Sequence, residues 1–497
     1  MLPGLTVPAS LAGVLQVLRP SFTAPSFATF TLLVVGMVAQ TGPRTVCGML
    51  LGAGLQAVVS HHRLHRFFSV NRWSADALGL VLARLVAERL LPAGAALEVA
   101  VDDTLFRRRG KQVHAAFWTH DASQPGRVTA RGNRWVIVGI VVRLPFQVRP
   151  TCLPVLFRLW GGKGSATPVE LARTLVGLLA RAFPDRVIHV VGDAAYHGRP
   201  LRDLPERVTF TTRVQRNAVL YAPAPPPTGK RGRPRTRGDR IGNPTQAGVG
   251  ASWRQTSVTR YGRTDTVAVA EVACLWYGAF GKRRGRLVLV GDRTAAPARE
   301  LALFTTDLTS TVEQIVARYA GRWSVEVAIE TAKGPMGVGQ ARNYLEQAVE
   351  RTVPFGMLTM SLVVIWYALH GHHPDDVTDR RARQPWYTTK TEPSFEDMLA
   401  KLRRTIIAAR FLPERPGRGC RITLGRMERG SGRALAVAGG VVRPGSAGPV
   451  VVWGGAGLSA WGLAPAWFRL APVRGWSWPG RRCGGCVLGG CGSSPTG

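Results

Sequence analysis

The chain has 497 residues, with 65 Lys and Arg against 30 Asp and Glu, which gives a formal net charge of +35. This length allows two or three domains with sizeable cores. So positive a charge favours a polyanionic partner, nucleic acid before an anionic membrane surface. Composition alone does not exclude that the charge is that of a ribosome-like protein, or that it reflects an arginine-rich proteome.

Seven cysteines in a chain of this length do not make a disulfide framework, so we expect a reducing, cytoplasmic setting. The apolar segments 27–39 and 354–369 are shorter than the ~20 residues that a membrane-spanning helix needs. The N-terminus lacks the basic region that opens a secretory signal. We therefore predict no membrane partner.

Residues 1–95 are expected to form a helical, DNA-binding domain. Apolar residues recur at helical spacing in three segments, Phe27–Ala39, Val46–Ser60 and Ala75–Leu91. The connection His61–Ser74 alternates basic and aromatic residues, and it either contacts DNA or simply links two helices. Its candidates for phosphate contacts are Arg63, Arg66 and Arg72. Its histidines lack a fourth ligand, which is more typical of a solvated or DNA-facing cluster than of a metal site.

Residues 96–213 are predicted to alternate strands with one helix. Leu97–Phe106 is a strand that runs into Asp102 and Asp103, and an apolar run ending in two acids is typical of a strand end that delivers carboxylates to a site. Further strands are predicted at 134–146, 153–159, 186–191 and 207–213, and a helix with a threonine cap at Thr167–Phe183. The strand 186–191 leads into another acid, Asp193.

Residues 214–300 are predicted to be a β-rich insertion, with strands in 257–274 and 286–291. The Pro-rich, basic segment Tyr221–Arg240 precedes these strands and is expected to be a mobile loop. Within it, the sequence from Arg231 to Pro234 is identical to the core of an AT-hook, in which Arg231 and Arg233 would enter a narrow minor groove. The alternative is a basic linker that only screens phosphates.

The segment Thr311–Lys333 is predicted to form one helix, because it starts at a threonine and stops at Gly334-Pro335. At ~100° per residue, one ridge about 60° wide carries Tyr319, Arg322, Glu326 and Lys333. The apolar stripe beside it, expected to face a core, consists of Val316, Ala320, Trp323 and Val327. Such a ridge can hold a metal ion at its carboxylate and phosphates at its cations. The alternative is an amphipathic helix with a solvated charged face.

Residues 301–411 contain this helix and two more predicted helices, 350–371 and 394–411. Residues 412–497 are a low-complexity tail rich in Gly, Arg and Trp, in which we expect neither a packed core nor a metal at Cys483 and Cys486. Acids at two strand ends and a third on a later helix predict an α/β fold, a ribonuclease-H-like mixed sheet flanked by helices.

The spacing of Tyr319, Arg322, Glu326 and Lys333 resembles the Y-R-E-K signature of DDE-type insertion-sequence transposases. The Asp-Asp-Thr sequence at Asp102 and the Gly-Asp-Ala-Ala-Tyr sequence at Asp193 resemble the two upstream motifs of that family. The resemblance extends over roughly residues 60–410. It implies that the catalytic and metal-binding acids are Asp102, Asp193 and Glu326. Asp103 is the alternative first acid, and Glu330 is the alternative third.

The same resemblance implies a cofactor of two Mg²⁺ ions, with Mn²⁺ as a substitute, and double-stranded DNA as the partner, both at terminal inverted repeats and at a target. DNA contacts are implied for Tyr319, Arg322 and Lys333, and stacking of a flipped base for Trp276 or Trp323. It further implies a homodimer on DNA in the bacterial cytoplasm, associated with the nucleoid. Two other hypotheses compete: an inactive or domesticated copy that only binds DNA, and a ribonuclease-H-like nuclease without strand transfer.

Overall fold

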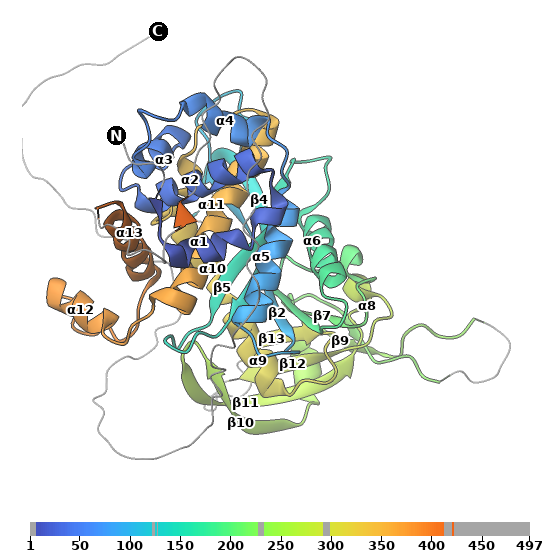
Figure 1. Cartoon of the computed structure of the whole chain (residues 1–497). Coiled ribbons are helices and arrows are strands. Elements are labelled where there is room, and N and C mark those ends of the chain that lie inside the picture. Colours follow the sequence, from blue (N-terminus) through green and yellow to red (C-terminus); the bar gives the residue numbers. More distant parts are fainter. Residues whose placement is uncertain are drawn as a thin grey trace, which may run out of the picture. The chain divides into compact units, whose positions relative to one another are not determined.

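The computed structural model describes residues 6–121, 125–126, 128–226, 233–291, 299–411 and 420–421 (Figure 1). The chain divides into two compact units. The first is Met1–Thr119 with Thr129–Leu424, and the second is His120–Val128 with Gly425–Gly497. The account below concerns the first unit. The predictions for Cys483, Cys486 and the rest of the tail beyond Arg421 lie outside the described residues.

A mixed five-stranded sheet forms the centre of this unit. Its strands are β2 (Leu97–Arg107), β4 (Thr129–Val142), β5 (Thr151–Trp160), β6 (Ile188–Gly192) and β7 (Val208–Arg213). They lie in the order β5-β4-β2-β6-β7. Strand β4 is antiparallel to β2 and β5, whereas β6 and β7 run parallel to β2. This is the ribonuclease-H-like sheet that the sequence predicted, flanked by helices.

Strand β2 corrects one expectation, because its two acids lie inside an 11-residue strand rather than at its end. The antiparallel partner β4 stays paired with β2 as far as Arg107, opposite Gly132. The parallel partner β6 stops earlier, and its last pairing joins Ala100 to Val191. The acids are therefore beyond the end of β6 while still held in a regular ladder by β4.

The β-rich insertion continues the central sheet. Its elements are β8 (Leu220–Tyr221), β9 (Arg240–Gly242), α7 (Pro244–Val249), β10 (Trp253–Arg260), β11 (Arg263–Cys274), α8 (Tyr277–Phe280), β12 (Gly285–Gly291) and β13 (Arg299–Thr305). Strands β10 to β13 are joined antiparallel in chain order, and β13 pairs with β7. With β3 (Phe117–His120), which lies beside β4, one sheet has ten strands. The predicted segment 257–274 is a hairpin that turns at Tyr261 and Gly262, both with positive φ, as a two-residue hairpin turn requires.

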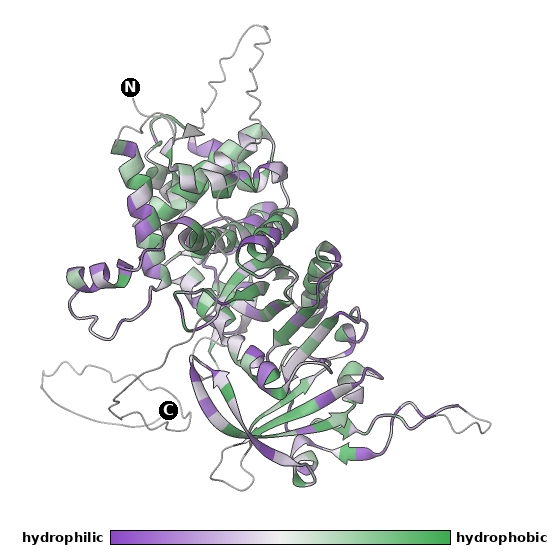
Figure 2. Cartoon of the chain, turned by 60° about the horizontal axis from the view of Figure 1, so that its bottom comes forward, coloured by the Kyte–Doolittle hydropathy of each residue, from purple (hydrophilic) through white to green (hydrophobic). Residues whose placement is uncertain are grey.

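Helices from both ends of the chain share one hydrophobic core with the sheet. They are α1 (Ala9–Gln16), α2 (Ala24–Ala39), α3 (Val46–Ala53), α4 (His61–Ser69), α5 (Ala75–Arg89), α6 (Pro168–Ala182), α11 (Glu346–Trp366) and α13 (Phe395–Phe411). Helix α12 (Asp376–Arg383) has no buried residue and does not contribute to this core. The predicted cap of α6 is confirmed as a capping box of Thr167 and Glu170. Figure 2 shows the strands and the helices beside them largely hydrophobic, whereas α12 is mostly hydrophilic.

One segment, Glu346–Gly371, is long and apolar enough to span a membrane, and 89% of its apolar window is buried inside the protein. It comprises α11 and a single π-helical turn, Tyr367–Gly371. Helix α11 packs against β5, α4, α5 and α13. Its apolar composition is thus accounted for by its place in the core, as predicted for this segment.

The predicted single helix Thr311–Lys333 is wrong at one point: it is two helices, α9 (Val312–Gly321) and α10 (Trp323–Lys333), which meet at Arg322. The backbone hydrogen bonds at the junction join residues three apart, as in a 3₁₀-helix, instead of four apart. The Arg322 N–H donates to the Tyr319 carbonyl at 3.1 Å, and the Val325 N–H donates to the Arg322 carbonyl at 2.9 Å.

The junction has a physical reason in packing. Residues of α9, including Val312 and Ile315, lie in a small apolar cluster with strands β10 to β13. Residues of α10, including Val325 and Ala332, lie in the main core. Because the two halves face different cores, the predicted apolar stripe does not continue: Trp323 is 52% exposed and Val327 is 48% exposed.

Candidate active site

Asp102 and Asp193 lie on neighbouring parallel strands at the same level. The register pairs Ala100 of β2 with Val191 of β6, so two residues further along Asp102 is opposite Asp193, on chains about 4.8 Å apart. The Asp193 carboxylate accepts a hydrogen bond from the Ala195 N–H at 2.9 Å, which turns the chain just after β6. The two predicted aspartates are thus brought together by the sheet.

Glu326 reaches the same place from helix α10, which packs against β2 and β5. The link is Arg322 at the start of the helix. Its guanidinium lies 2.7 Å from a Glu326 oxygen and 3.7 Å from an Asp102 oxygen. The negative charge of Asp193 contributes to raising the pKa of both other acids. The three predicted acids therefore share one electrostatic site, with a cation held between two of them.

Two of these carboxylates, Asp102 and Glu326, are hard to ionise. Burial raises the pKa of Asp102 to about 7, and the neighbouring charges of Asp103 and Asp193 act in the same direction. A hydrogen bond from the Asp103 N–H, at 2.8 Å, and the positive charge of Arg322 oppose this shift only in part. Burial also raises the pKa of Glu326, again against Arg322. The raised pKa values thus come mainly from burial, which the Arg322 guanidinium offsets only in part.

Asp103 points to the other face of β2, as strand alternation requires. Its carboxylate lies 2.5 Å from the Arg134 guanidinium on β4 and accepts a hydrogen bond from the Tyr196 hydroxyl at 3.2 Å. Burial, and then the Asp103 charge, raise the pKa of Tyr196 well above its usual value, so the phenol stays a donor. Asp103 already has a cation and a donor, whereas Asp102 has like charges around it, and this favours Asp102 as the first acid.

The other members of the predicted ridge line up along the two helices. Tyr319, 9% exposed, packs under Arg322, whose guanidinium carbon lies 5.7 Å from the ring centre. Lys333 lies at the far end of α10, with its ammonium 5.6 Å from the ring centre of Phe106 on β2. The alternative third acid, Glu330, is exposed on the outer side of α10. Glu326 is therefore the carboxylate of this helix that joins the two aspartates.

Two groups near the site were missed from the sequence. Arg134 neutralises Asp103, and Arg213 lowers the pKa of Tyr319 in partial opposition to burial. Gly192 pairs with Thr212 across β6 and β7, so Arg213, the last residue of β7, is level with Asp193, which comes just after β6. Its place at the end of a neighbouring strand was the available signal for Arg213.

The candidates for base stacking have different environments. Trp276 is 5% exposed, and the His197 ring stacks on it with ring centres 4.9 Å apart, so one face is already covered. Trp323 is the exposed one, and it lies one turn before Glu326 on α10. Arg233 is exposed, whereas Arg231 lies outside the described residues. The accessible stacking candidate beside the three acids is therefore Trp323.

The basic and aromatic connection His61–Ser74 contains helix α4, and its aromatic residues belong to the core. Phe67, Phe68 and Trp73 are buried and pack around Phe355 of α11 or one another. The Arg63 guanidinium donates to Thr29 at 3.0 Å and to the Pro25 carbonyl at 3.3 Å. Of the three candidate phosphate contacts, Arg66 and Arg72 are the exposed ones.

The donor set fits a hard divalent cation. Asp102, Asp193 and Glu326 offer carboxylate oxygens, which Mg²⁺ and Mn²⁺ prefer. A guanidinium already lies between Asp102 and Glu326, so a positive charge is stabilised where the acids converge. Burial is the main cause of the raised pKa of Asp102, and divalent ions at this site would stabilise its negative charge.

Comparison with known families supports this arrangement. Residues 17–272 match the family described as DDE superfamily endonuclease. The match covers slightly more than half of the chain, includes the strands before Asp102 and Asp193, and ends before α9 and α10. A search of curated proteins gave no match. The chain belongs to the DDE superfamily endonucleases.

Proposed function

We propose that this endonuclease is a transposase that binds the ends of its own insertion sequence and catalyses metal-dependent cleavage and strand transfer of DNA. Family membership makes DNA the substrate. The observation that carries the finer proposal is the convergence of Asp102, Asp193 and Glu326, with Arg322 beside two of them and Lys333 further along the same helix. Together with Tyr319 on α9, these residues of the junction and of α10 have the spacing of the Y-R-E-K signature.

Asp102, Asp193 and Glu326 would together hold two Mg²⁺ ions. When bound, such ions supply charge stabilisation for the attacking and leaving oxygens of a phosphodiester. Tyr319, Arg322 and Lys333 would bind phosphates near the transposon end, and Trp323 offers an exposed ring for a displaced base. The net charge of +35 supports a long DNA footprint.

The reaction has two stages. Water attacks a phosphodiester at the element's end, forming a new P–O bond and releasing a 3′-hydroxyl. That 3′-hydroxyl then attacks a target phosphodiester, forming the joint and releasing the target's own 3′-hydroxyl. Each step exchanges one P–O bond for another, so no co-reactant beyond water is required. A homodimer that holds two ends would permit both joints, and this belongs to the proposal.

The experiment is a cleavage and joining assay. Full-length protein and Mg²⁺ are mixed with labelled DNA that carries the element's own ends, beside a Glu326→Ala control. Nicking at the end followed by joining to a target, both lost in the control, is the expected result. Cleavage without joining would favour a ribonuclease-H-like nuclease, and binding without nicking would favour an inactive copy; either result contradicts the proposal.

A further inference from the structure

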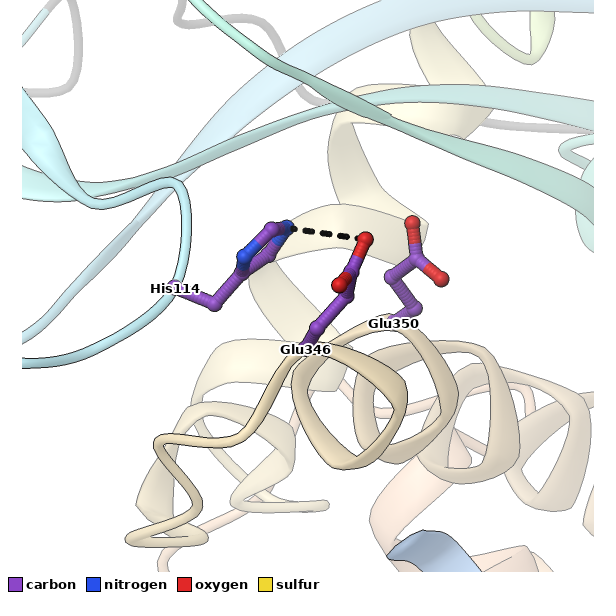
Figure 3. A group of neighbouring side chains, drawn as sticks. All are labelled: His114, Glu346 and Glu350. Carbon is purple, nitrogen blue, oxygen red and sulfur yellow. Dashed lines mark ion pairs between the residues drawn. The ribbon is translucent and has the colours of Figure 1, made fainter.

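A second group of metal-ligand side chains lies apart from the three acids. Ligand atoms of His114, Glu346 and Glu350 all lie within 4.8 Å of one another, the one such group of three found among the described residues. Figure 3 shows the imidazole facing the two glutamates, which rise from the start of α11. The His114 Nε2 atom lies 3.9 Å from a Glu346 oxygen.

The position of His114 is fixed by its main chain. Its N–H donates to the Tyr344 carbonyl at 2.9 Å, just before α11. Its carbonyl accepts from the side-chain amide of Asn133 at 2.9 Å, and Asn133 is fully buried and bonded in turn to Arg108. The next residue, Ala115, has a φ of 49°, a left-handed conformation that is unusual without glycine. The imidazole is therefore held beside α11 by a buried network rather than by its contact with Glu346.

The two glutamates face the same way because they are one turn apart, and two like charges at this spacing cost a few tenths of a kcal/mol. The Glu350 carboxylate attracts the guanidinium groups of Arg158 and Arg351, whose pKa values it acts to raise. The His114 imidazole lies beside both glutamates. A cation placed between the three groups would offset the repulsion between the glutamates.

The chemistry of the group selects the ion. Zinc binds imidazole nitrogen and carboxylate oxygen at about 2.0–2.2 Å in tetrahedral geometry, which places two of its ligand atoms about 3.3–3.6 Å apart. The ligand atoms of the three side chains lie within 4.8 Å of one another, so they must move closer to bind zinc, and both glutamates are exposed and able to rotate. A nitrogen ligand disfavours Mg²⁺, which prefers oxygen.

We propose that His114, Glu346 and Glu350 bind one divalent transition-metal ion, with zinc as the representative, at a site distinct from the three acids. Three protein ligands leave at least one coordination position for water. The ion ties the loop after β2 to the start of α11. The proposal does not depend on the proposed DNA chemistry, because it concerns binding alone.

The test counts zinc bound to the full-length protein after dialysis against a low-micromolar zinc buffer with excess Mg²⁺. All variants carry Cys47→Ser, since the Cys47 thiol lies 3.7 Å from His65 and offers a competing ligand. His114→Ala and Glu350→Gln are each expected to bind one zinc ion fewer per chain than the parent. The matched control His120→Ala changes an exposed histidine six residues further along the chain and should leave the count unchanged.

Thermal unfolding in EDTA checks that each variant folds as the parent does. A folded His114→Ala variant that binds as much zinc as the parent overturns the proposal. Glu326→Gln is the second control. In a chain that carries this substitution, His114→Ala should still lower the zinc count by one ion per chain, whatever the DNA assays give. A difference that disappears in the Glu326→Gln background would assign the zinc to the three acids and also overturn the proposal.

Discussion

The two faces of strand β2 carry neighbouring aspartates in opposite electrostatic situations. On one face, Asp103 has the Arg134 guanidinium at 2.5 Å and the Tyr196 hydroxyl at 3.2 Å. On the other, burial raises the pKa of Asp102 to about 7, with Asp193 adding to the shift and Arg322 only partly opposing it. Both residues are the same acid on the same strand, so the difference comes from what each face packs against.

The contrast indicates how a fold separates a structural carboxylate from one kept for chemistry. A buried carboxylate that is paired with a cation is already compensated, whereas one that faces like charges is suited to bind a cation. The protein accepts the cost of the second arrangement where β6 ends and α10 crosses β2. The predictions below test whether the two faces differ in function as they do in charge.

The largest effect is expected in catalysis. Asp193→Asn should lower DNA cleavage by at least ~10³-fold, because it removes a carboxylate from the uncompensated face. DNA affinity should stay within about threefold, since the phosphate-binding cations are intact. Asp103→Asn, on the compensated face, should lower cleavage by no more than about tenfold. Rates and gel-shift affinities check this, and cleavage retained in Asp193→Asn would remove that residue from the site.

The compensated face should instead matter for stability. Arg134→Gln leaves the mostly buried Asp103 without its cation and should lower the free energy of unfolding by roughly 2 kcal/mol. The matched control is Arg143→Gln, whose ion pair with Glu98 joins the same two strands but is 59% exposed on the arginine. That control should cost under about 1 kcal/mol. Urea unfolding measures both, and equal losses would contradict the comparison.

The uncompensated face predicts a pH dependence of metal-free stability. The folded-state pKa of Asp102, about 7, is above its ordinary value of 3.8. The folded chain therefore binds this proton more tightly, and the stability it contributes is present at low pH and lost as pH rises from about 4 through about 7. Between pH 5.5 and 8, the Asp102 titration should lower the free energy of unfolding of the wild type by roughly 1–2 kcal/mol, and Asp102→Asn should abolish this loss.

Thermal unfolding in EDTA at the two pH values checks this prediction. The quantity to compare is the difference between the wild type and Asp102→Asn, which cancels the titration of other groups. Asp103→Asn is the control and should keep most of the pH dependence, with a small reduction because the Asp103 charge also raises the pKa of Asp102. A pH dependence that is the same with and without Asp102 would show that its carboxyl is not buried among like charges.

The smallest effect concerns DNA binding along α10. Lys333→Ala should reduce the slope of log affinity against log salt by about 0.9, the value for one phosphate contact on duplex DNA. Lys163→Ala removes the same charge from an exposed lysine between β5 and α6 and is the control. Affinities of DNA end fragments at several salt concentrations measure both. Equal slopes for Lys333→Ala and the wild type would remove Lys333 from the DNA interface.

Much of the fold could be predicted from local pattern. The strands that follow one another around α6 are apolar runs of ordinary length, and the Thr167 cap marks the helix start. The position of Asp193 after β6 was visible for the same reason. The position of Asp102 inside β2 could not be predicted, because it depends on the pairing with β4, which continues past the two acids.

Other features depend on contacts that are distant in sequence. The break at Arg322 follows from two cores meeting the two halves of one helical segment, and no local signal marks it. Trp323 and Val327 therefore became exposed where helical periodicity predicted burial. The partner of Asp103 and the meeting of His114 with Glu346 likewise depend on strand register and loop packing.

The most direct test of the difference between the two faces is a titration of Mn²⁺ into the full-length protein at pH 8, in a His114→Ala background. Asp102→Asn should weaken Mn²⁺ binding at least ~10-fold, because a charged ligand is lost from the converging acids. Asp103→Asn should bind within about threefold of its parent, because its charge is already used by Arg134. Equal weakening by the two substitutions, or weakening by Asp103→Asn alone, would contradict the assignment of Asp102 to the metal site.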